Sequence, residues 1–332
     1  MKEISIIGAG SWGTALAVMA ARAGHVVRLW SRNEPVVDSI NRYRVNPQYL
    51  KSTPIPEGIA ATINIETALS RGSLVLIAVP SHAVRDTLDI VAPFLGENSI
   101  IVSVTKGIEI ETTKRISEIV KEAVGSSNPF VSLSGPSFAK EVVAGHPTAI
   151  VAASKDSAAA RVVQNDLRFE NLRIYTNTDV VGTELGGSVK NVMAIAAGMT
   201  AGLGFGANSV AALITRGLAE ITRLARREGA QMETLMGLAG LGDLVLTCTS
   251  SLSRNRFVGE ELGKGRTLAE ITAGLNEVAE GINTARAVKK MSDRAGLEMP
   301  ITNEVNAVLY DGKPARDAVA ELMSRPLREE IS

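Results

Sequence analysis

The chain has 332 residues, of which 45% are hydrophobic and 4% aromatic, so its length predicts about two domains with aliphatic, alanine-rich cores. Its 35 Lys and Arg balance 35 Asp and Glu, and this zero net charge excludes a strongly basic nucleic-acid binder. The single cysteine, Cys248, cannot form an intramolecular disulfide, which favours a cytoplasmic location. The longest apolar run, from Val192 to Phe205, is shorter than the ~20 residues that span a bilayer, so no membrane partner is expected.

Short β-branched runs alternate with helical patterns up to about Thr178. The strands are expected at Glu3–Ile7, Val26–Trp30, Leu74–Val79, Ile100–Val104, Phe130–Ser132, Ala149–Ala153 and Leu172–Tyr175. These runs are apolar nearly throughout, as in strands that are covered on both faces, and stretches such as Ser11–Ala23 have helical spacing. The alternation predicts an α/β fold in residues 1–178, a Rossmann-type domain with a doubly wound parallel sheet.

From Asp179 onward the β-branched runs stop. Helices are expected at Thr183–Gly202, Ser209–Glu228, Arg254–Gly263, Thr267–Ala273, Thr284–Arg294 and Ile301–Tyr310. Residues 179–332 are therefore predicted to form an all-helical C-terminal domain. A ligand is expected in the cleft between the two domains, beyond the carboxyl ends of the parallel strands.

The first predicted strand leads into the glycine-rich turn Gly8-Ala9-Gly10-Ser11-Trp12-Gly13, which a helical stretch follows. In this pattern Gly8 permits the tight turn, Gly10 lets a pyrophosphate approach the backbone, and Gly13 lets the helix pack on the strand. The helix N-terminus then offers free N–H groups to the phosphates. The pattern lies where a strand ends and a helix begins, so it predicts a dinucleotide site rather than a simple turn.

The second strand ends at Trp30-Ser31-Arg32, where a site specific for NAD usually has Asp or Glu against the ribose hydroxyls. Arg32 could instead contact the extra phosphate of NADP, a charge-assisted contact worth about 1.5–3 kcal/mol. The alternative is a solvated arginine, with Glu34 turning toward the ribose. The sequence favours NADPH, with NADH as the alternative.

Hydride transfer to a carbonyl requires a proton partner for the oxygen. His25, His82 and His146 are widely separated, lack a convincing chemical setting and have no carboxylate partners at ligand spacing, so no metal is expected. Lys190 is better placed, near the start of a predicted helix. Gly186 and Gly187 precede Lys190 and Asn191 by one turn, which predicts a bare patch for a ligand or a nicotinamide ring. The alternative is a surface lysine that extends along its helix.

Two further segments follow strands at the same edge of the sheet. Lys106, at the end of the fourth predicted strand, could bind an anionic substrate and lower the pKa of a neighbouring lysine. The run Gly135-Pro136-Ser137 exposes N–H groups and a hydroxyl to this edge, although it could equally be a helix cap.

A second anion site is predicted around residues 238–256. Ser253 is a natural N-cap for the following helix, and Arg256 stands where a capping box would have Glu or Gln. The N-terminus of this helix, together with Arg254 and Asn255, predicts a binding site for a phosphate monoester. Asp243 could orient a substrate hydroxyl or a lysine ammonium, or it could be a turn residue. Cys248 has no base partner, so it is expected to be a small core residue.

These motifs, in this order along the chain, resemble bacterial-type NAD(P)-dependent glycerol-3-phosphate dehydrogenases. The resemblance rests on GAGSWG at residues 8–13, TKG at 105–107, GPSFA at 135–139, GGSVKN at 186–191, and above all LAGLGDLVLTC with SRN at 238–255. It implies an enzyme that reversibly reduces dihydroxyacetone phosphate to sn-glycerol 3-phosphate for glycerophospholipid synthesis, and a homodimer in many members.

The resemblance also assigns residues. It puts the proton acceptor on Lys190. It puts substrate contacts on Lys106, Gly135, Ser137, Lys190, Asp243, Ser253, Arg254 and Asn255. It puts cofactor contacts, besides the turn glycines, on Ser11, Trp12, Arg32, Tyr49, Lys106, Ala139, Arg254, Val278 and Glu280.

Two other functions fit parts of the pattern. A relative of 3-hydroxyacid or 6-phosphogluconate dehydrogenases would share the architecture but act on a carboxylate, and the phosphate site at 253–255 favours the triose instead. A regulator that senses NADPH without catalysis would not need Lys190, Asp243 and Arg254 together.

Overall fold

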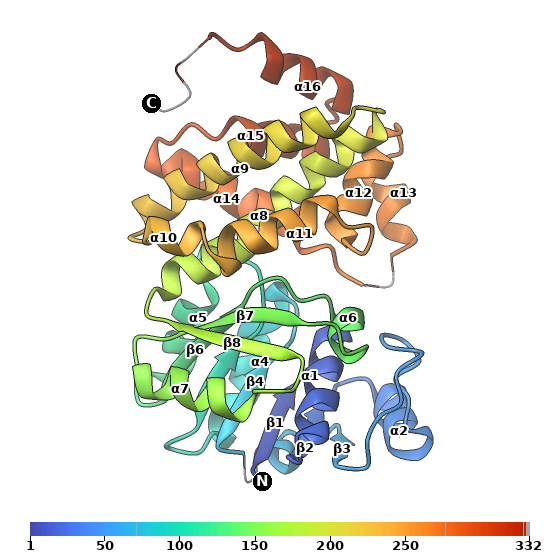
Figure 1. Cartoon of the computed structure of the whole chain (residues 1–332), viewed down its shortest axis with the longest axis vertical. Helices are drawn as coiled ribbons and strands as arrows, with labels where there is room; N and C mark the ends of the chain where they lie inside the picture. The colour runs from blue at the N-terminus through green and yellow to red at the C-terminus, as the bar shows by residue number, and fades with distance from the viewer. Residues whose placement is uncertain (71, 276, 328, 330–332) are drawn as a thin grey trace.

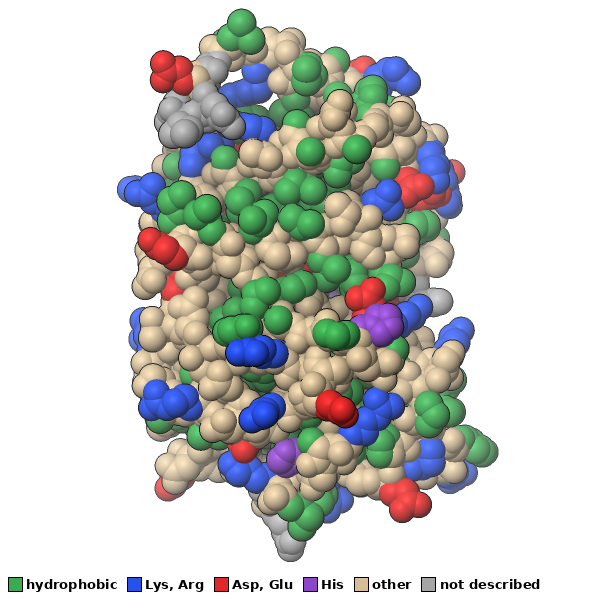
Figure 2. Space-filling model, in the orientation of Figure 1, with side chains coloured by type: hydrophobic (Ala, Val, Ile, Leu, Met, Phe, Trp, Pro, Cys, Tyr) green, Lys and Arg blue, Asp and Glu red, His purple; other side chains and the backbone are tan. Residues whose placement is uncertain are grey.

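The computed structural model describes residues 1–70, 72–275, 277–327 and 329. A domain built on a β-sheet lies at one end of the long axis and a helical domain at the other, with the N-terminus and the helix Ala315–Ser324 at opposite ends (Figure 1). Basic and acidic side chains are interspersed over the face shown in Figure 2, as the balanced composition predicts. Among the described residues no single helix has the length and apolarity to cross a membrane, but one bent pair, Met232–Thr249 with Arg254–Gly263, meets both criteria.

The sheet has eight strands in the order β3-β2-β1-β4-β5-β6-β7-β8. The strands are β1 (Glu3–Ile7), β2 (Val26–Trp30), β3 (Ile59–Thr62), β4 (Leu74–Ile77), β5 (Ile100–Ser103), β6 (Phe130–Ser134), β7 (Thr148–Ala153) and β8 (Leu172–Asn177). The first six are mutually parallel, which confirms a doubly wound, Rossmann-type sheet.

The last two strands run in the opposite direction. β7 is antiparallel to β6, and β8 is parallel to β7, so the prediction that these strands continue a parallel sheet is wrong. The reason lies in the connection from β6 to β7, whose only helix is α6 (Ala139–Val143). Five helical residues extend only about 7.5 Å, too little to carry the chain back along a strand for a parallel crossover. β3 was not predicted, since two of the four residues in its sequence, Ile-Ala-Ala-Thr, are alanines, which have little preference for strands.

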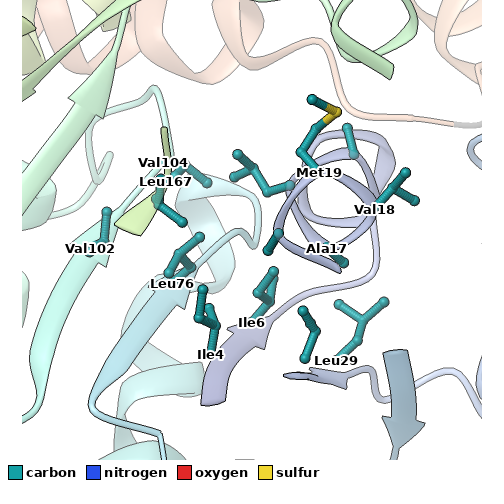
Figure 3. Packing of buried hydrophobic residues seen from close by; sticks show 14 of the residues in the cluster. Ile4, Ile6, Ala17, Val18, Met19, Leu29, Leu76, Val102, Val104 and Leu167 are labelled. Carbon is teal, nitrogen blue, oxygen red and sulfur yellow. The ribbon is translucent and has the colours of Figure 1, made fainter. Parts of the chain in front are cut away.

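Seven helices cover the sheet. They are α1 (Ser11–Arg22), α2 (Glu34–Tyr43), α3 (Ile65–Leu69), α4 (Val84–Val91), α5 (Ile116–Val124), α6 and α7 (Ser157–Asp166), with short 3-10 turns at η1 (Ser81–Ala83) and η2 (Ala92–Phe94). The main core lies between α1 and the central strands (Figure 3). There Ile4 and Ile6 of β1 are fully buried beneath Ala17 and Val18 of α1, so the glycine-rich turn stands on a rigid base.

Among the described residues, every regular element after Asp179 is helical, which confirms the all-helical C-terminal part. Its elements are α8 (Val180–Gly202), α9 (Ala207–Arg227), α10 (Met232–Leu235), the π-helical turn η3 (Leu238–Gly242), α11 (Asp243–Thr249), α12 (Arg254–Gly263), α13 (Leu268–Ala273), α14 (Glu280–Ala295), α15 (Pro300–Tyr310) and α16 (Ala315–Ser324). α8 begins three residues before the predicted start because Asp179 caps it, accepting a 2.8 Å hydrogen bond from Gly182 N–H. The boundary between domains at residue 178 stays a prediction.

α8 and α12 cross at very short range because glycines line their contact. A Cβ atom at Gly259 would lie 1.9 Å from the carbonyl oxygen of Ile195, and one at Gly198 would lie 2.0 Å from that of Arg256. Any side chain at these positions would push the two backbones apart. The crossing holds the start of α12 against the middle of α8.

We expect Gly259→Ala to destabilise the protein because the added methyl group must displace the backbone of α8. Overpacking of this kind costs about 1–3 kcal/mol, and rigid backbone on the opposite side favours the upper end. Chemical denaturation followed by far-UV circular dichroism measures the change. Gly274→Ala is the control, since its Cβ would meet only Ile271 O at 3.7 Å. Equal free energies of unfolding for Gly259→Ala and Gly274→Ala would contradict the close contact between α8 and α12.

Candidate active site

A cleft of about 780 Å³ lies between the carboxyl ends of the parallel strands and the helical domain, where the sequence predicts it. Most predicted site residues line it: Gly8, Gly10, Ser11, Trp12, Arg32, Tyr49, Lys106, Ser137, Lys190, Asp243, Ser253, Arg254, Asn255, Val278 and Glu280. Three others, Gly13, Gly135 and Ala139, are not among the described residues that line it. The fold thus gathers residues from Gly8 to Glu280, which lie far apart in sequence.

The glycine-rich turn has the geometry that its three glycines predict. Gly8 has φ +118°, and a Cβ there would lie 2.6 Å from Ala78 O. A Cβ at Gly13 would lie 2.0 Å from Gly8 O, so α1 packs directly on the turn. By contrast, a Cβ at Gly10 would meet no atom within 4 Å. The open space in front of Gly10 fits a dinucleotide pyrophosphate, which would lie where a side chain would otherwise project.

Arg32 follows β2 and lines the same cleft with an exposed side chain. It makes no hydrogen bond or ion pair with the part of the chain that the structure describes. Glu34, the alternative ribose partner, is the first residue of α2 and is not among the described residues that line the cleft. The guanidinium is therefore available to an anionic ligand at the adenosine end.

Lys106, Lys190 and Asp243 form one buried ionic cluster. The Asp243 carboxylate, 1% exposed, accepts hydrogen bonds from Lys190 Nζ at 2.6 Å and from Lys106 Nζ at 2.7 Å. Lys190 Nζ also contacts Thr247 Oγ1 at 2.7 Å. Lys106 comes from the end of β5, Lys190 from α8 and Asp243 from the start of α11. The alternative readings of Lys190 as a surface lysine and of Asp243 as a turn residue are wrong.

The cluster shifts the pKa values of its members. Burial disfavours the charged ammonium of Lys190 and, together with the nearby positive charge of Lys106, lowers its pKa to about 8 against the opposing pull of Asp243. Burial alone would raise the pKa of Asp243, but the two ammonium groups outweigh it and hold that pKa below its ordinary value. Lys190 can therefore exchange a proton near neutral pH while Asp243 stays ionised.

The glycines before Lys190 do not form the predicted bare patch. A Cβ at Gly186 would lie 2.8 Å from Ala239 O, and one at Gly187 would lie 2.5 Å from Ser134 Oγ. Both faces are therefore filled by protein, and the prediction of a ligand surface there is wrong. The missing side chain of Gly186 lets η3 approach α8 closely.

The predicted phosphate site is built around the start of α12. Ser253 Oγ accepts a hydrogen bond from Arg256 N–H at 3.2 Å, which confirms the N-cap. Asn255 is held by its neighbours, because its amide donates to Asn191 Oδ1 and accepts from Gly281 N–H. Arg254 lines the cleft and pairs with Glu277.

Ser137 and Gly135, which follow the neighbouring strand β6, support Lys106 from the sheet side of the cleft. The Gly135 carbonyl oxygen accepts hydrogen bonds from Lys106 Nζ at 2.8 Å and from Ser137 Oγ at 2.9 Å. Gly135 has φ +136°, a conformation that other residues rarely adopt, and it is this backbone geometry that turns its carbonyl toward the lysine.

Two site residues were missed from the sequence. Thr247 follows Asp243 by one helical turn, so the four-residue spacing could have revealed it. Glu277 binds both Ser11 Oγ at 2.7 Å and Arg254, a contact between distant segments that leaves no local signal. Glu280 is likewise occupied by protein, since it accepts hydrogen bonds from Ser81 N–H and Ser81 Oγ, and burial raises its pKa.

Cys248 is buried beside the cluster, and burial raises the pKa of its thiol to about 12, which confirms its interpretation as a core residue. His82 lines the cleft but contacts neither lysine of the cluster. Among the described residues, no group of three or more His, Cys, Asp or Glu side chains could hold a metal ion.

Comparisons with known proteins agree with this architecture. The sequence profile of the NAD-dependent glycerol-3-phosphate dehydrogenase N-terminus matches residues 3–160, and that of the C-terminus matches residues 179–320. The chain is 52% identical over 335 residues to glycerol-3-phosphate dehydrogenase (NAD(P)+) of Koribacter versatilis, covering 100% of this chain and 99% of that protein. It is 48% identical over 331 residues to the enzyme of the same name from a Geobacter species, with 99% of each chain covered.

Solved structures of similar proteins agree with these sequence matches. A 2.1 Å crystal structure of glycerol-3-phosphate dehydrogenase from Coxiella burnetii matches with a TM-score of 0.95 and 41% identity, covering 98% of this chain and 99% of that one. A D-mandelate dehydrogenase, solved with NADH and anilino(oxo)acetate, matches with a TM-score of 0.63 at 12% identity, a likeness of fold alone.

Proposed function

The chain belongs to the family of NAD-dependent glycerol-3-phosphate dehydrogenases, and we propose that it reduces dihydroxyacetone phosphate to sn-glycerol 3-phosphate, reversibly, with a nicotinamide dinucleotide. In this proposal, residues 1–178 bind the dinucleotide and residues 179–332 supply the proton and hold the substrate. The observation that carries it is the Lys106–Asp243–Lys190 cluster, which lies in one cleft with both the dinucleotide turn and the predicted phosphate site. The product is a precursor for glycerophospholipid synthesis.

Lys190 is the proposed proton donor to the ketone oxygen. Its ammonium is buried in the cleft, and its pKa of about 8 lets it give up a proton to a developing alkoxide near neutral pH. Asp243 and Thr247 hold Nζ in place, so the proton is aimed before the substrate arrives. In the reverse reaction the neutral amine accepts the proton from the alcohol.

The remaining substrate contacts follow from the positions of the side chains. Lys106, Gly135, Ser137 and Asp243 are proposed to bind the hydroxyl and carbonyl end. Ser253, Arg254 and Asn255 are proposed to hold the phosphate, where the free N–H groups of α12 and the guanidinium supply positive charge. A carboxylate substrate without a phosphate would leave this second group of contacts unused.

The reduced nicotinamide ring, when bound, supplies the hydride for the substrate carbon. The open space at Gly10 fits the pyrophosphate of the dinucleotide, and Ser11, Trp12, Tyr49, Ala139, Val278 and Glu280 are the further proposed contacts. We propose NADPH as the preferred coenzyme because Arg32, which makes no ion pair with the described residues, borders the adenosine end, whereas Glu34, the alternative ribose partner, is not among the described residues that line the cleft. NADH is the alternative.

The proposed setting is the cytoplasm, which the single cysteine favours. The balanced charge of the chain argues against a nucleic-acid partner, and no membrane partner is proposed. By the resemblance to the family, the proposed assembly is a homodimer.

Replacing Lys190 with Ala should abolish most of the activity because the alkoxide loses its proton donor. General acid catalysis of this kind contributes about 10²–10⁴-fold, so kcat for dihydroxyacetone phosphate reduction should fall by at least that order. Stopped-flow absorbance of NADPH oxidation measures it, and fluorescence titration should show that NADPH still binds. Near-normal turnover by the variant would remove Lys190 from the chemistry. A wild-type protein that binds NADPH but oxidises none with saturating substrate would instead be a dinucleotide sensor.

The pH dependence of the reaction should follow Lys190. Reduction requires the protonated ammonium, so kcat/KM for dihydroxyacetone phosphate should be flat below pH 8 and fall about tenfold per pH unit above it. Oxidation of glycerol 3-phosphate requires the neutral amine, so its kcat/KM should rise with pH and level off above 8. Steady-state rates in both directions across pH 6–10 test this. The same transition in the residual activity of Lys190→Ala would assign it to another group.

Coenzyme preference should depend on Arg32. Arg32→Ala should weaken NADPH binding by about 10- to 100-fold, the value of a charge-assisted contact to phosphate, and leave NADH binding unchanged. Isothermal titration calorimetry with each coenzyme measures both affinities. Arg28→Ala is the matched control, since Arg28 lies on β2, four residues before Arg32, but pairs with Glu3 and is not among the described residues that line the cleft. Parallel losses of NADPH and NADH affinity at Arg32→Ala would contradict the assignment.

A further inference from the structure

Asn46 lies behind the glycine-rich turn, 37 residues away in sequence, and is fully buried. Its side-chain amide donates two hydrogen bonds, to Ala9 O at 2.9 Å and to Thr14 Oγ1 at 2.8 Å. Thr14 Oγ1 in turn donates to the same Ala9 carbonyl at 3.2 Å. The carbonyl oxygen in the middle of the turn is therefore held by two side chains on the side away from the cleft.

Holding that carbonyl also orients the next N–H group. The peptide between Ala9 and Gly10 is planar and trans, so its C=O and N–H point to opposite sides. With the Ala9 oxygen drawn toward Asn46 and Thr14, the Gly10 N–H faces the other way, away from these two side chains. Gly10 lines the cleft, and the space at its Cβ position is open. Among the described residues, the N–H groups of Gly10, Ser11 and Trp12 have no hydrogen-bond acceptor.

The segment that carries Asn46 contacts the turn a second time. Asn46 and Leu50 close a short bridge, and one residue before Leu50 the carbonyl oxygen of Tyr49 accepts a hydrogen bond from Ser11 Oγ at 3.3 Å. Tyr49 lines the cleft, whereas Asn46 is not among the described residues that do. The segment therefore contacts the turn at Ala9, away from the cleft, and at Ser11, in the wall of the cleft.

We propose that Asn46 is a positioning residue for the dinucleotide pyrophosphate: it fixes the Ala9–Gly10 peptide so that the free N–H groups of the turn point at the phosphates before the coenzyme binds. This proposal rests on the proposed dinucleotide-binding role of the turn. A polar side chain is required there because an aliphatic residue would leave the Ala9 carbonyl with one partner and the turn free to rotate. Asn46 touches neither substrate nor coenzyme in this role.

The test compares ligands with and without the pyrophosphate. Asn46→Ala should weaken the binding of NADPH and of 2′-phospho-ADP-ribose about tenfold, and leave the binding of 2′-AMP, which has no pyrophosphate, unchanged. ADP-ribose and AMP replace the two fragments if NADH proves to be the coenzyme. Calorimetric titration measures each affinity, and kcat at saturating NADPH should stay within twofold of the wild type. Asn41→Ala is the control: Asn41, on the same helix-loop segment, makes two hydrogen bonds to the backbone of Ala61 and none to the turn.

The proposal would be overturned if Asn46→Ala lost equal affinity for the fragments with and without the pyrophosphate, or lost affinity for neither. Failure of the wild type to bind NADPH would instead overturn the proposed function. If Asn46→Ala does not fold, Thr14→Val carries the same test, since it removes the second restraint on Ala9 with almost no change in shape. Where both variants fold, their combination should weaken NADPH binding by less than the product of the single effects, because both act on one carbonyl. A loss equal to that product would contradict the shared restraint.

Discussion

The site depends on one buried carboxylate that two lysines share. Asp243 is almost inaccessible to water, and a lone carboxylate there would be strongly unfavourable. Lys106 and Lys190 compensate it from opposite sides of the cleft, and the cluster keeps a net charge of +1. That surplus suits an anionic substrate. Burial, aided by the charge of Lys106 and opposed by Asp243, lowers the pKa of Lys190 to about 8, which suits its proposed role as proton donor.

The packing of η3 against α8 positions the carboxylate of Asp243. Gly186 lacks a side chain, so the backbone of Ala239 and Gly240 lies directly against α8, and η3 leads straight into α11, whose first residue is Asp243. A larger residue at Gly186 would move η3 outward and carry Asp243 away from Lys190. The glycines of α8 thus serve contacts between protein segments, one turn before the lysine that serves the ligand.

Helices and strands that depend on local sequence patterns were predicted well, whereas contacts between distant segments were not. β1, β2 and α12 have the predicted limits because apolar runs, the glycine-rich turn and the Ser253 cap are all local patterns. β3 escaped prediction because two alanines carry little strand preference, and the direction of β7 depends on how far a short connection can reach. Residue type and spacing pointed to Lys106, Lys190 and Asp243, whereas Tyr49, Ala139, Val278 and Glu280 were predicted only from the resemblance to the family. Their partners, such as Glu277 on Ser11 or Asn46 on Ala9, depend on the assembled fold.

Polar contacts join the two domains at the cleft, in addition to an apolar cluster in which Val151 and Ala153 of β7 pack with Val180 and Ala239. Glu277 binds Ser11, Glu280 binds Ser81, and Asp243 binds Lys106, and each pair links the helical domain to the sheet domain. Ser11, Glu280 and Lys106 are also proposed ligand contacts. A ligand that uses them must exchange its own hydrogen bonds for these, which offsets part of its binding free energy. The same exchange means that a ligand that uses these side chains would act on contacts that link the two domains, so its binding and the domain geometry would be coupled through them.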